Sequence, residues 1–290
     1  MSLLQNTMAK SGTANFYNGV ATQSARFNQP ASSYLYKSVS SGTRTKSTFA
    51  WWMKRGKTTV STGEMFSFGA SGAGTSQSSG RITLQTTTIK ISQEDSNSVT
   101  WQVIPTQFFR DFSAWYHCVV VIDTTQGTAA DRVKVYINGN KVTSFSTASY
   151  PSQNSSTRFG LSGVNRIGVG EASGVAWAAS YFDGYFADMY YLDGVAVSDS
   201  SGVISEFGEF KNGVWIPIEY TGSFGTNGFR LKLDQVGVGT ASSSTIGADT
   251  SGNTNHFTSS GIVASDCAMP DSPENNFCTM NPLDTVGTIE

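Results

Sequence analysis

Cysteine, histidine and charge are all scarce in this chain of 290 residues, and each shortage excludes a class of protein. The three cysteines are an odd number, and their spacing matches no zinc-binding motif. The two histidines have no nearby residues that would complete a catalytic triad. Only 14% of the residues are charged and the net charge is −2, so the chain lacks the basic surface that nucleic acid requires.

Long apolar segments are missing as well. No run approaches the roughly 20 apolar residues of a membrane-spanning helix, so we expect no membrane insertion. The start of the chain, Met1 to Asn6, has no basic region followed by an apolar stretch, so we expect no signal peptide. A surface of low charge, rich in Ser, Thr, Gly and Asn, suits an extracellular β-protein or a virion part, and a virion part needs no export signal because lysis of the host releases it.

The carboxylate pattern of a glycan-cleaving enzyme is also missing. Retaining glycosidases hold two carboxylates about 5 Å apart, and same-face neighbours on a strand are two residues apart. The chain has no Glu-x-Asp-x-Glu run, and the adjacent Glu94 and Asp95 point to opposite faces. Asp183, Asp188 and Asp193 are five residues apart and alternate faces unless a bulge intervenes. We therefore expect no enzyme.

Strand patterns, in contrast, are abundant. In residues 133–137, valine and isoleucine alternate with Lys134 and Tyr136, the period of a strand with one buried face. Asn138 and Gly139 follow, and this pair supplies the two positive φ angles of a tight hairpin. Many such short apolar segments recur between Gly, Ser, Thr and Asn clusters, which favours an all-β sandwich.

The chain divides into three parts by composition. Residues 1–20 are polar and form either a flexible arm or an attachment arm; residues 21–200 form the sandwich; residues 201–290 form a β-rich extension. The helical spacing of apolar residues in 200–210 predicts one or two turns of helix, weakened by Gly208. Residues 249–258 either complete the sandwich or begin a second module.

Several segments together carry a family resemblance. They include Trp115-Tyr116-His117 before an apolar strand, the hairpin of residues 135–139, and the aspartate- and tyrosine-rich segment 181–194. Further matching segments are residues 24–28, 51–56, 213–217, 220–229, 271–277 and 281–283. Over residues 20–285 the sequence resembles laminin G-like (concanavalin A-like lectin/glucanase) domains of the type found in virion structural proteins of tailed bacteriophages.

The resemblance implies a fold and a function. The fold is a two-sheet antiparallel jelly-roll sandwich with a C-terminal β-rich extension and very little helix. The function is that of a virion structural protein, a fibre, tail or capsid appendage that adheres to cell-surface glycan. Its partners are other virion proteins, further copies of itself and a bacterial surface glycan. An architectural protein that binds no sugar is the alternative, and a glycan-cleaving enzyme comes third.

Candidate ligand-binding residues follow from these expectations. Sugar sites combine exposed aromatic rings with planar polar groups on loops, which points to Trp177, Tyr181 and Tyr150. The alternative for Trp177 and Tyr181 is that they close the end of the sandwich as core residues. No cofactor is required, but laminin G-like domains often bind calcium at one rim through carboxylate, amide and carbonyl oxygens. The principal candidate ligands are Asp183, Glu171 and Asn165. Asp123 and Asp131 are further candidates, and all five are also typical of turns at strand ends.

Four other polar residues call for a structural role. Cys118 and His117 lie in an apolar strand and are expected to be buried, the first as a reduced thiol. Asp188 lies among apolar residues, so it needs either a partner or a bulge. His256 is expected to face solvent or to stabilise a turn. Cys267 and Cys278 could pair across a short loop, although cytoplasmic assembly disfavours disulfides.

Overall fold

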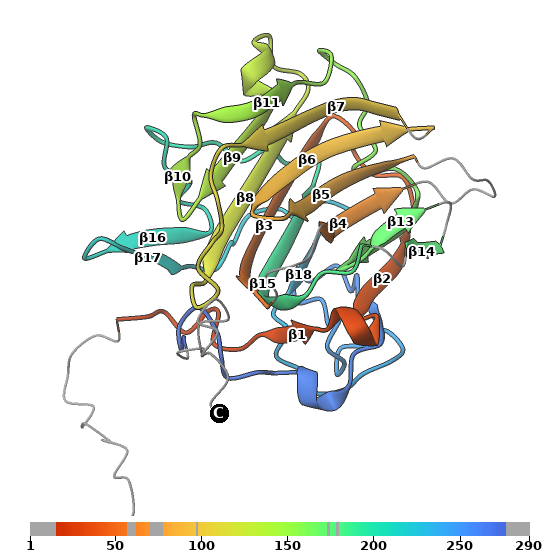
Figure 1. The fold of residues 1–290 in the computed structure, drawn as a ribbon, viewed down its shortest axis with the longest axis vertical. Coiled ribbons are helices and arrows are strands. Elements are labelled where there is room, and N and C mark those ends of the chain that lie inside the picture. Colours follow the sequence, from red (N-terminus) through yellow and green to blue (C-terminus); the bar gives the residue numbers. More distant parts are fainter. Residues whose placement is uncertain are drawn as a thin grey trace, which may run out of the picture.

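The fold consists of two stacked antiparallel sheets (Figure 1). The computed structural model describes residues 16–56, 62–69, 78–96, 98–172, 175–177 and 180–276. Within these ranges there is no α-helix, and the helical turns are three short 3-10 segments: η1 (Gln29–Ala31), η2 (Ala129–Asp131) and η3 (Ala264–Asp266). The predicted all-β antiparallel sandwich is confirmed. No helix in the described part of the chain has the length and hydropathy of a membrane span.

The first sheet has seven strands. Six of them follow the order β1-β15-β3-β8-β9-β10, and the seventh, β18, pairs with β15 outside this order. Its strands are β1 (Ala25–Phe27), β3 (Lys46–Arg55), β8 (Tyr116–Asp123), β9 (Val133–Ile137), β10 (Asn140–Lys141), β15 (Gly184–Asp193) and β18 (Phe229–Leu231).

The second sheet has eight strands in the order β11-β7-β6-β5-β4-β12-β2-β19. Its strands are β2 (Tyr34–Val39), β4 (Thr62–Gly69), β5 (Ser79–Gln85), β6 (Thr88–Asp95), β7 (Ser98–Pro105), β11 (Phe145–Ser149), β12 (Gly163–Ile167) and β19 (Thr258–Ser260). Two small hairpins, β13 (Gly170–Ala172) with β14 (Val175–Trp177) and β16 (Gly208–Lys211) with β17 (Val214–Pro217), lie outside these sheets.

The seven-stranded sheet is buried on both faces, which explains the continuous apolar run of β8. Cys118 and Val120 point into the core between the sheets, where Phe49 and Trp51 are also fully buried. The alternate residue Val119 belongs to a second apolar cluster on the other face, covered by residues from the segment 195–224. Each fully buried valine contributes about 2 kcal/mol to folding, so both faces stabilise this sheet.

The predicted hairpin between β9 and β10 is present. Asn138 has a φ of 47° and Gly139 a φ of 82°, the two positive values that this tight turn requires. The Asn138 side chain also fixes the turn, because its Oδ1 accepts a hydrogen bond from the His117 backbone N at 2.9 Å. A Cβ atom on Gly139 would lie 2.4 Å from the Trp215 ring, so only glycine fits here.

The strand β15 carries a bulge at Asp188, as its sequence requires. The register shifts between Ala187 and Tyr190, and Asp188 has a φ of 43°. The carboxylate is buried and paired, since it accepts hydrogen bonds from Arg230 Nε at 2.9 Å and from the Tyr190 hydroxyl at 3.0 Å. Burial raises the pKa of Asp188, and Arg230 opposes that rise. The expectation of a partner or a bulge is confirmed in both respects.

Residues after 200 add strands to both sheets. β18 extends the seven-stranded sheet beside β15, and β19 pairs with β2 at the edge of the eight-stranded sheet. Residues 249–258 lead into β19, so they join the existing sandwich. The helix predicted for residues 200–210 is wrong: Ser201 and Gly202 have positive φ angles, which form a turn, and Gly208 begins β16.

The two ends of the described chain are held together. The Glu274 carboxylate accepts hydrogen bonds from the backbone N of Gly19, Val20 and Ala21 at 2.8, 2.7 and 3.0 Å. Most of the predicted N-terminal arm lies outside the described residues. Cys267 is a buried free thiol, and Cys278, its proposed partner, lies outside the described residues.

Candidate functional site

Two adjoining hollows lie at one open side of the sandwich, where the chain crosses from one sheet to the other. β10 is the edge strand of the seven-stranded sheet, and β11 is the edge strand of the eight-stranded sheet. Residues 142–144 connect them. This crossing segment therefore runs along the gap between the two sheet edges, and hollows form beside it.

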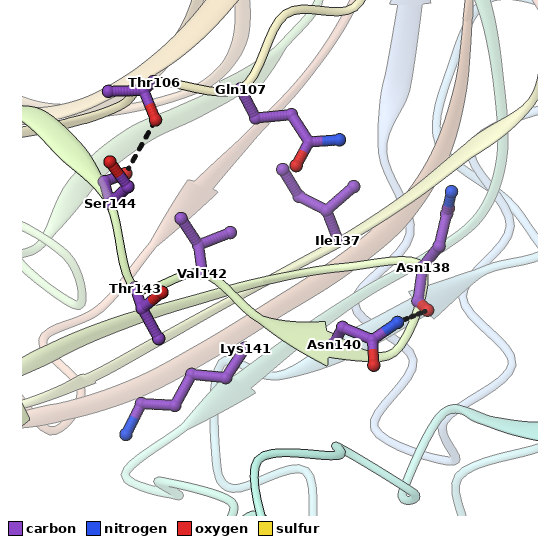
Figure 2. A pocket seen from close by; sticks show the side chains of 9 residues that line it. All are labelled: Thr106, Gln107, Ile137, Asn138, Asn140, Lys141, Val142, Thr143 and Ser144. Atoms are coloured by element: carbon purple, nitrogen blue, oxygen red, sulfur yellow. Dashed lines mark hydrogen bonds between the residues drawn. The ribbon is translucent and has the colours of Figure 1, made fainter.

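The larger hollow has a volume of about 430 Å³, within the range of ordinary ligand pockets (Figure 2). We call it the amide hollow, because three side-chain amides line it together with three hydroxyls, two apolar side chains and one amine. Its residues are Thr106, Gln107, Ile137, Asn138, Asn140, Lys141, Val142, Thr143 and Ser144.

Local hydrogen bonds fix several groups of the amide hollow. Thr106 donates to the carbonyl of Ser144 through its backbone N at 3.1 Å and through its hydroxyl at 3.3 Å. Asn140 Nδ2 donates to the carbonyl of Asn138 at 3.2 Å. The exposed Gln107 amide has no hydrogen-bond partner among the residues that the structure describes. It is therefore available to a ligand.

The smaller hollow has a volume of about 240 Å³, and its lining includes two aromatic side chains, both from β11 or the residue that follows it. We call it the tyrosine hollow. Its residues are Ala130, Asp131, Val133, Lys134, Lys141, Val142, Thr143, Phe145 and Tyr150. Three of them, Lys141 to Thr143, also line the amide hollow.

Tyr150 is held in place by its neighbours. It packs against the main core cluster, and Arg132 Nη1 donates to the carbonyl of the next residue, Pro151, at 3.0 Å. Burial, and secondarily the charge of Asp131, raises the pKa of the Tyr150 phenol. The phenol therefore stays neutral near pH 7 and can donate a hydrogen bond.

The structure separates the three aromatic residues predicted to bind sugar. Tyr150 lines the tyrosine hollow. Tyr181 is only 8% exposed and packs against Tyr34 with ring centroids 6.2 Å apart, which agrees with the alternative that it is a core residue and not an exposed platform. It is buried because β2 brings Tyr34 beside it, a contact that the sequence does not reveal. The side chain of Trp177 lies outside the described residues.

Within the residues that the structure describes, the candidate calcium ligands do not form a common site. Asn165 is buried on β12, and Asp183 accepts a hydrogen bond from the backbone N of Gln29 at 3.3 Å. The Glu171 side chain lies outside the described residues. Within the described ranges no three His, Cys, Asp or Glu side chains form a group suited to a metal ion. Calcium binding stays a prediction.

The remaining turn candidates have structural roles. Asp123 accepts hydrogen bonds from the backbone N and the hydroxyl of Thr125, which is the predicted Asx turn. Asp131 pairs with Lys134 at 3.6 Å. His256 stabilises a turn by accepting a hydrogen bond from the Asp249 backbone N at 3.0 Å.

His117 is fully buried, as expected, on the outer face of the seven-stranded sheet. Its Nδ1 accepts a hydrogen bond from Trp215 Nε1 at 3.1 Å, and its ring lies 4.8 Å from that of Trp52. Burial lowers the pKa of His117 to about 3, so the ring is neutral. The arrangement anchors the β16–β17 hairpin on the sheet.

Two glutamates converge on one arginine in the eight-stranded sheet. Arg81 Nη1 lies 3.6 Å from Glu64 Oε1 and 3.5 Å from Glu94 Oε2. Burial raises the pKa of Glu64 to about 7, although Arg81 opposes this rise. Neither glutamate lines the amide hollow or the tyrosine hollow.

Sequence reasoning missed most of the residues that line the two hollows. Gln107 and Asn140 gave no signal because one lies in the β7–β8 connection and the other at the start of β10, and these segments meet only in the folded chain. The one available signal was the density of amide and hydroxyl residues directly after the predicted hairpin.

Comparison with known proteins places this architecture. A family model described as the concanavalin A-like lectin/glucanases superfamily matches residues 27–201, more than half of the chain. No curated protein sequence matches.

Solved structures with similar folds are distant. A SAP-like pentraxin from Limulus polyphemus has 17% identity and a TM-score of 0.43, with 62% of this chain and 80% of that chain covered. A protein from Bacteroides ovatus, proposed to bind carbohydrate, has 12% identity and a TM-score of 0.49, with 83% and 58% covered. The CBM40 of a Ruminococcus gnavus IT-sialidase has 12% identity and a TM-score of 0.39, with 58% and 95% covered. These structures are too distant to indicate a function. The family match shows that the chain belongs to the concanavalin A-like lectin/glucanases superfamily.

Proposed function

We propose that this protein binds saccharides without cleaving them, and that the amide hollow is its binding site. The observation that carries the proposal is the lining of that hollow: side-chain amides, hydroxyls and the apolar side chains of Ile137 and Val142 surround about 430 Å³. Sugars present many hydroxyl groups beside apolar C–H faces, and such a lining complements both.

The chemistry of the lining favours a neutral polar ligand. An amide group can donate and accept at once, so it can bind two neighbouring sugar hydroxyls. Asn138 already uses its Oδ1 on the His117 backbone N, which leaves its Nδ2 as a donor with a fixed direction. Preorganised groups of this kind lose little side-chain entropy when a ligand binds.

The biological setting that we propose is host adhesion by a virion appendage of a tailed bacteriophage. The resemblance of segments 115–139 and 181–194 to phage virion proteins supports it, as does the low charge of the chain. Several copies on one particle would convert weak single-site affinity into firm attachment.

We propose that the carboxylates of this protein do not cleave a bound glycan. Glycosidases place an acid and a nucleophile on either side of a bound sugar. Here Glu64 and Glu94 are both engaged by Arg81 and are largely buried. Incubation of the purified protein with a bacterial surface polysaccharide should leave its chain length unchanged, and any shortening would contradict this part of the proposal.

A glycan array tests the binding proposal. We expect wild-type protein to give signals that Gln107→Ala and Asn140→Ala each weaken about fivefold, since one hydrogen bond contributes about 1 kcal/mol. Gln153→Ala is the matched control, because Gln153 is an exposed amide that lines neither hollow. Equal signals from all four proteins would contradict the assignment of the site.

An architectural role is the second candidate, and the β16–β17 hairpin favours it. Phe210 and Val214 on this hairpin are 46% and 47% exposed, so the hairpin presents apolar side chains that a partner could cover. If this hairpin packs on another copy of the chain, Phe210→Ser should convert oligomers to monomers in analytical ultracentrifugation. A wild-type protein that is monomeric at all concentrations would contradict self-association through this hairpin.

A further inference from the structure

We infer that the amide hollow and the tyrosine hollow are two subsites of one site, and that its ligand is an oligosaccharide that crosses the Lys141–Thr143 segment. The inference rests on the proposed saccharide binding and specifies its ligand class. It starts from the three residues that line both hollows, Lys141, Val142 and Thr143.

The positions of the hollows along the β9–β10 hairpin set the length of the ligand. The tyrosine hollow adjoins the start of β9 at Val133 and Lys134, whereas the amide hollow adjoins its end at Ile137 and Asn138. Four residues of strand correspond to about 13 Å. A single monosaccharide cannot reach both places, whereas a short oligosaccharide can.

The segment between the hollows is firmly held, so it can serve as a fixed rim. The backbone N of Lys141 donates to the Gly202 carbonyl at 2.8 Å, and that of Val142 donates to the Val135 carbonyl at 2.8 Å. On the other side, the Ser144 carbonyl accepts from the Thr106 backbone N at 3.1 Å.

Thr143 is the last residue of this rim and offers free groups to a ligand. Its side chain is exposed. Its backbone N and carbonyl have no hydrogen-bond partner within the part of the chain that the structure describes. A saccharide that crosses the rim can therefore bond to peptide groups whose positions are already set by their neighbours.

The two hollows differ in chemistry in a way that divides the ligand between them. The amide hollow presents hydrogen-bonding groups from Gln107, Asn138 and Asn140, which suit one sugar unit by its hydroxyls. The tyrosine hollow presents Phe145 and Tyr150, which suit the apolar face of another unit. At about 240 Å³ the second hollow is smaller than ordinary ligand pockets, so we assign it as an extension of the first.

A length series tests the inference. The probes are size-fractionated mono- to hexasaccharides of the polysaccharide that gives the strongest array signal, titrated by calorimetry. We expect the wild-type Kd to fall at least tenfold between the monosaccharide and the tetrasaccharide. Tyr150→Ala should remove most of this gain and leave the monosaccharide Kd within twofold of the wild-type value.

A second variant keeps the test informative if Tyr150→Ala folds poorly. Ala130 is exposed and lines only the tyrosine hollow, so Ala130→Arg places a long side chain there and should also remove the length dependence without weakening monosaccharide binding. Tyr36→Ala is the control, since Tyr36 is an exposed tyrosine on β2 that lines neither hollow. Its length series should match that of the wild type.

The outcomes separate this inference from the proposed function. Binding that Gln107→Ala weakens, but with equal Kd for all chain lengths, would overturn the two-subsite inference and leave saccharide binding intact. Binding that Tyr150→Ala or Ala130→Arg weakens equally for every length would also overturn it. A wild-type protein that binds no saccharide of any length would overturn both.

Discussion

The buried ion pair between Asp188 and Arg230 should contribute several kcal/mol to the stability of the sandwich. Both side chains are about 2–3% exposed, and Asp188 Oδ1 lies 2.9 Å from Arg230 Nε. Replacement of Asp188 by asparagine keeps the shape of the side chain and tolerates the positive φ of 43° at the bulge. The substitution therefore isolates the loss of the charge.

The expected cost follows from leaving Arg230 charged and without its buried partner. Removal of one member of a buried pair typically destabilises a protein by about 3–5 kcal/mol. Arg230 Nη1 retains a contact with the exposed Glu219 at 2.6 Å, so we expect the lower end, about 3 kcal/mol. That corresponds to a fall in Tm of roughly 6–12 °C.

Urea denaturation of Asp188→Asn measures this cost, and Asp131→Asn is the matched control. Asp131 pairs with Lys134 at the surface at 3.6 Å, so its replacement should cost less than about 0.5 kcal/mol. The double variant Asp188→Asn/Arg230→Met should recover at least about 1 kcal/mol relative to the sum of the two single variants. If Asp188→Asn costs no more than Asp131→Asn, the buried pair does not stabilise the fold as reasoned.

Four further predictions concern other parts of the fold. Burial lowers the folded-state pKa of His117 from its usual 6.5 to about 3, so between these pH values the unfolded chain binds a proton that the folded chain does not. The free energy of unfolding should therefore decrease as the pH falls from 6.5 to 3, by up to about 1.4 kcal/mol per pH unit. Urea titrations of His117→Phe should show a weaker pH dependence. The folded-state pKa of Glu64 is raised from 4.5 to about 7, so the protonated side chain stabilises the fold at low pH and this contribution is lost as the pH rises through 7. The free energy of unfolding of Glu64→Gln should therefore increase relative to that of the wild type between pH 5 and pH 8. Glu274→Gln removes the carboxylate that binds three backbone N–H groups and should speed amide hydrogen exchange at residues 19–21, whereas unchanged exchange would contradict the clamp. Gly139→Ala should cost at least about 2 kcal/mol in thermal or urea unfolding, because its Cβ would meet the Trp215 ring at 2.4 Å and its φ of 82° is strained for alanine.

Local patterns in the sequence predicted the fold well, because the alternation of apolar and polar residues in a segment shows which side chains the fold buries. The alternation in residues 133–137 and the turn chemistry of Asn138 and Gly139 both reappear in the β9–β10 hairpin. The buried His117 and the paired Asp188 were also predictable, since a polar group on an apolar face must find a partner.

The failures arise where distant segments meet. The apolar spacing in residues 200–210 resembles a helix, but those residues face the covered side of the seven-stranded sheet, where Ile204 and Phe207 pack on Tyr190 and its neighbours. The position of Tyr181 in the sequence left both an exposed and a buried ring open, and the contact with Tyr34 buries it. Periodicity within a segment carries no information about either contact.

The candidate site was predictable only in part for the same reason. Tyr150 could be selected from its loop, but the amides of Gln107 and Asn140 acquire a common direction only when the β7–β8 connection and the hairpin meet at the sandwich edge. The crossing between the sheets that creates the rim at Thr143 is a property of the topology.

Chemical-shift mapping by NMR with an array-positive oligosaccharide tests the assigned binding site most directly. We expect the side-chain amide resonances of Gln107, Asn138 and Asn140 and the backbone resonance of Thr143 to shift on titration, while those of Asn253, in a distant turn, stay in place. Shifts centred on other residues, with none at Gln107 or Asn140, would contradict the assignment.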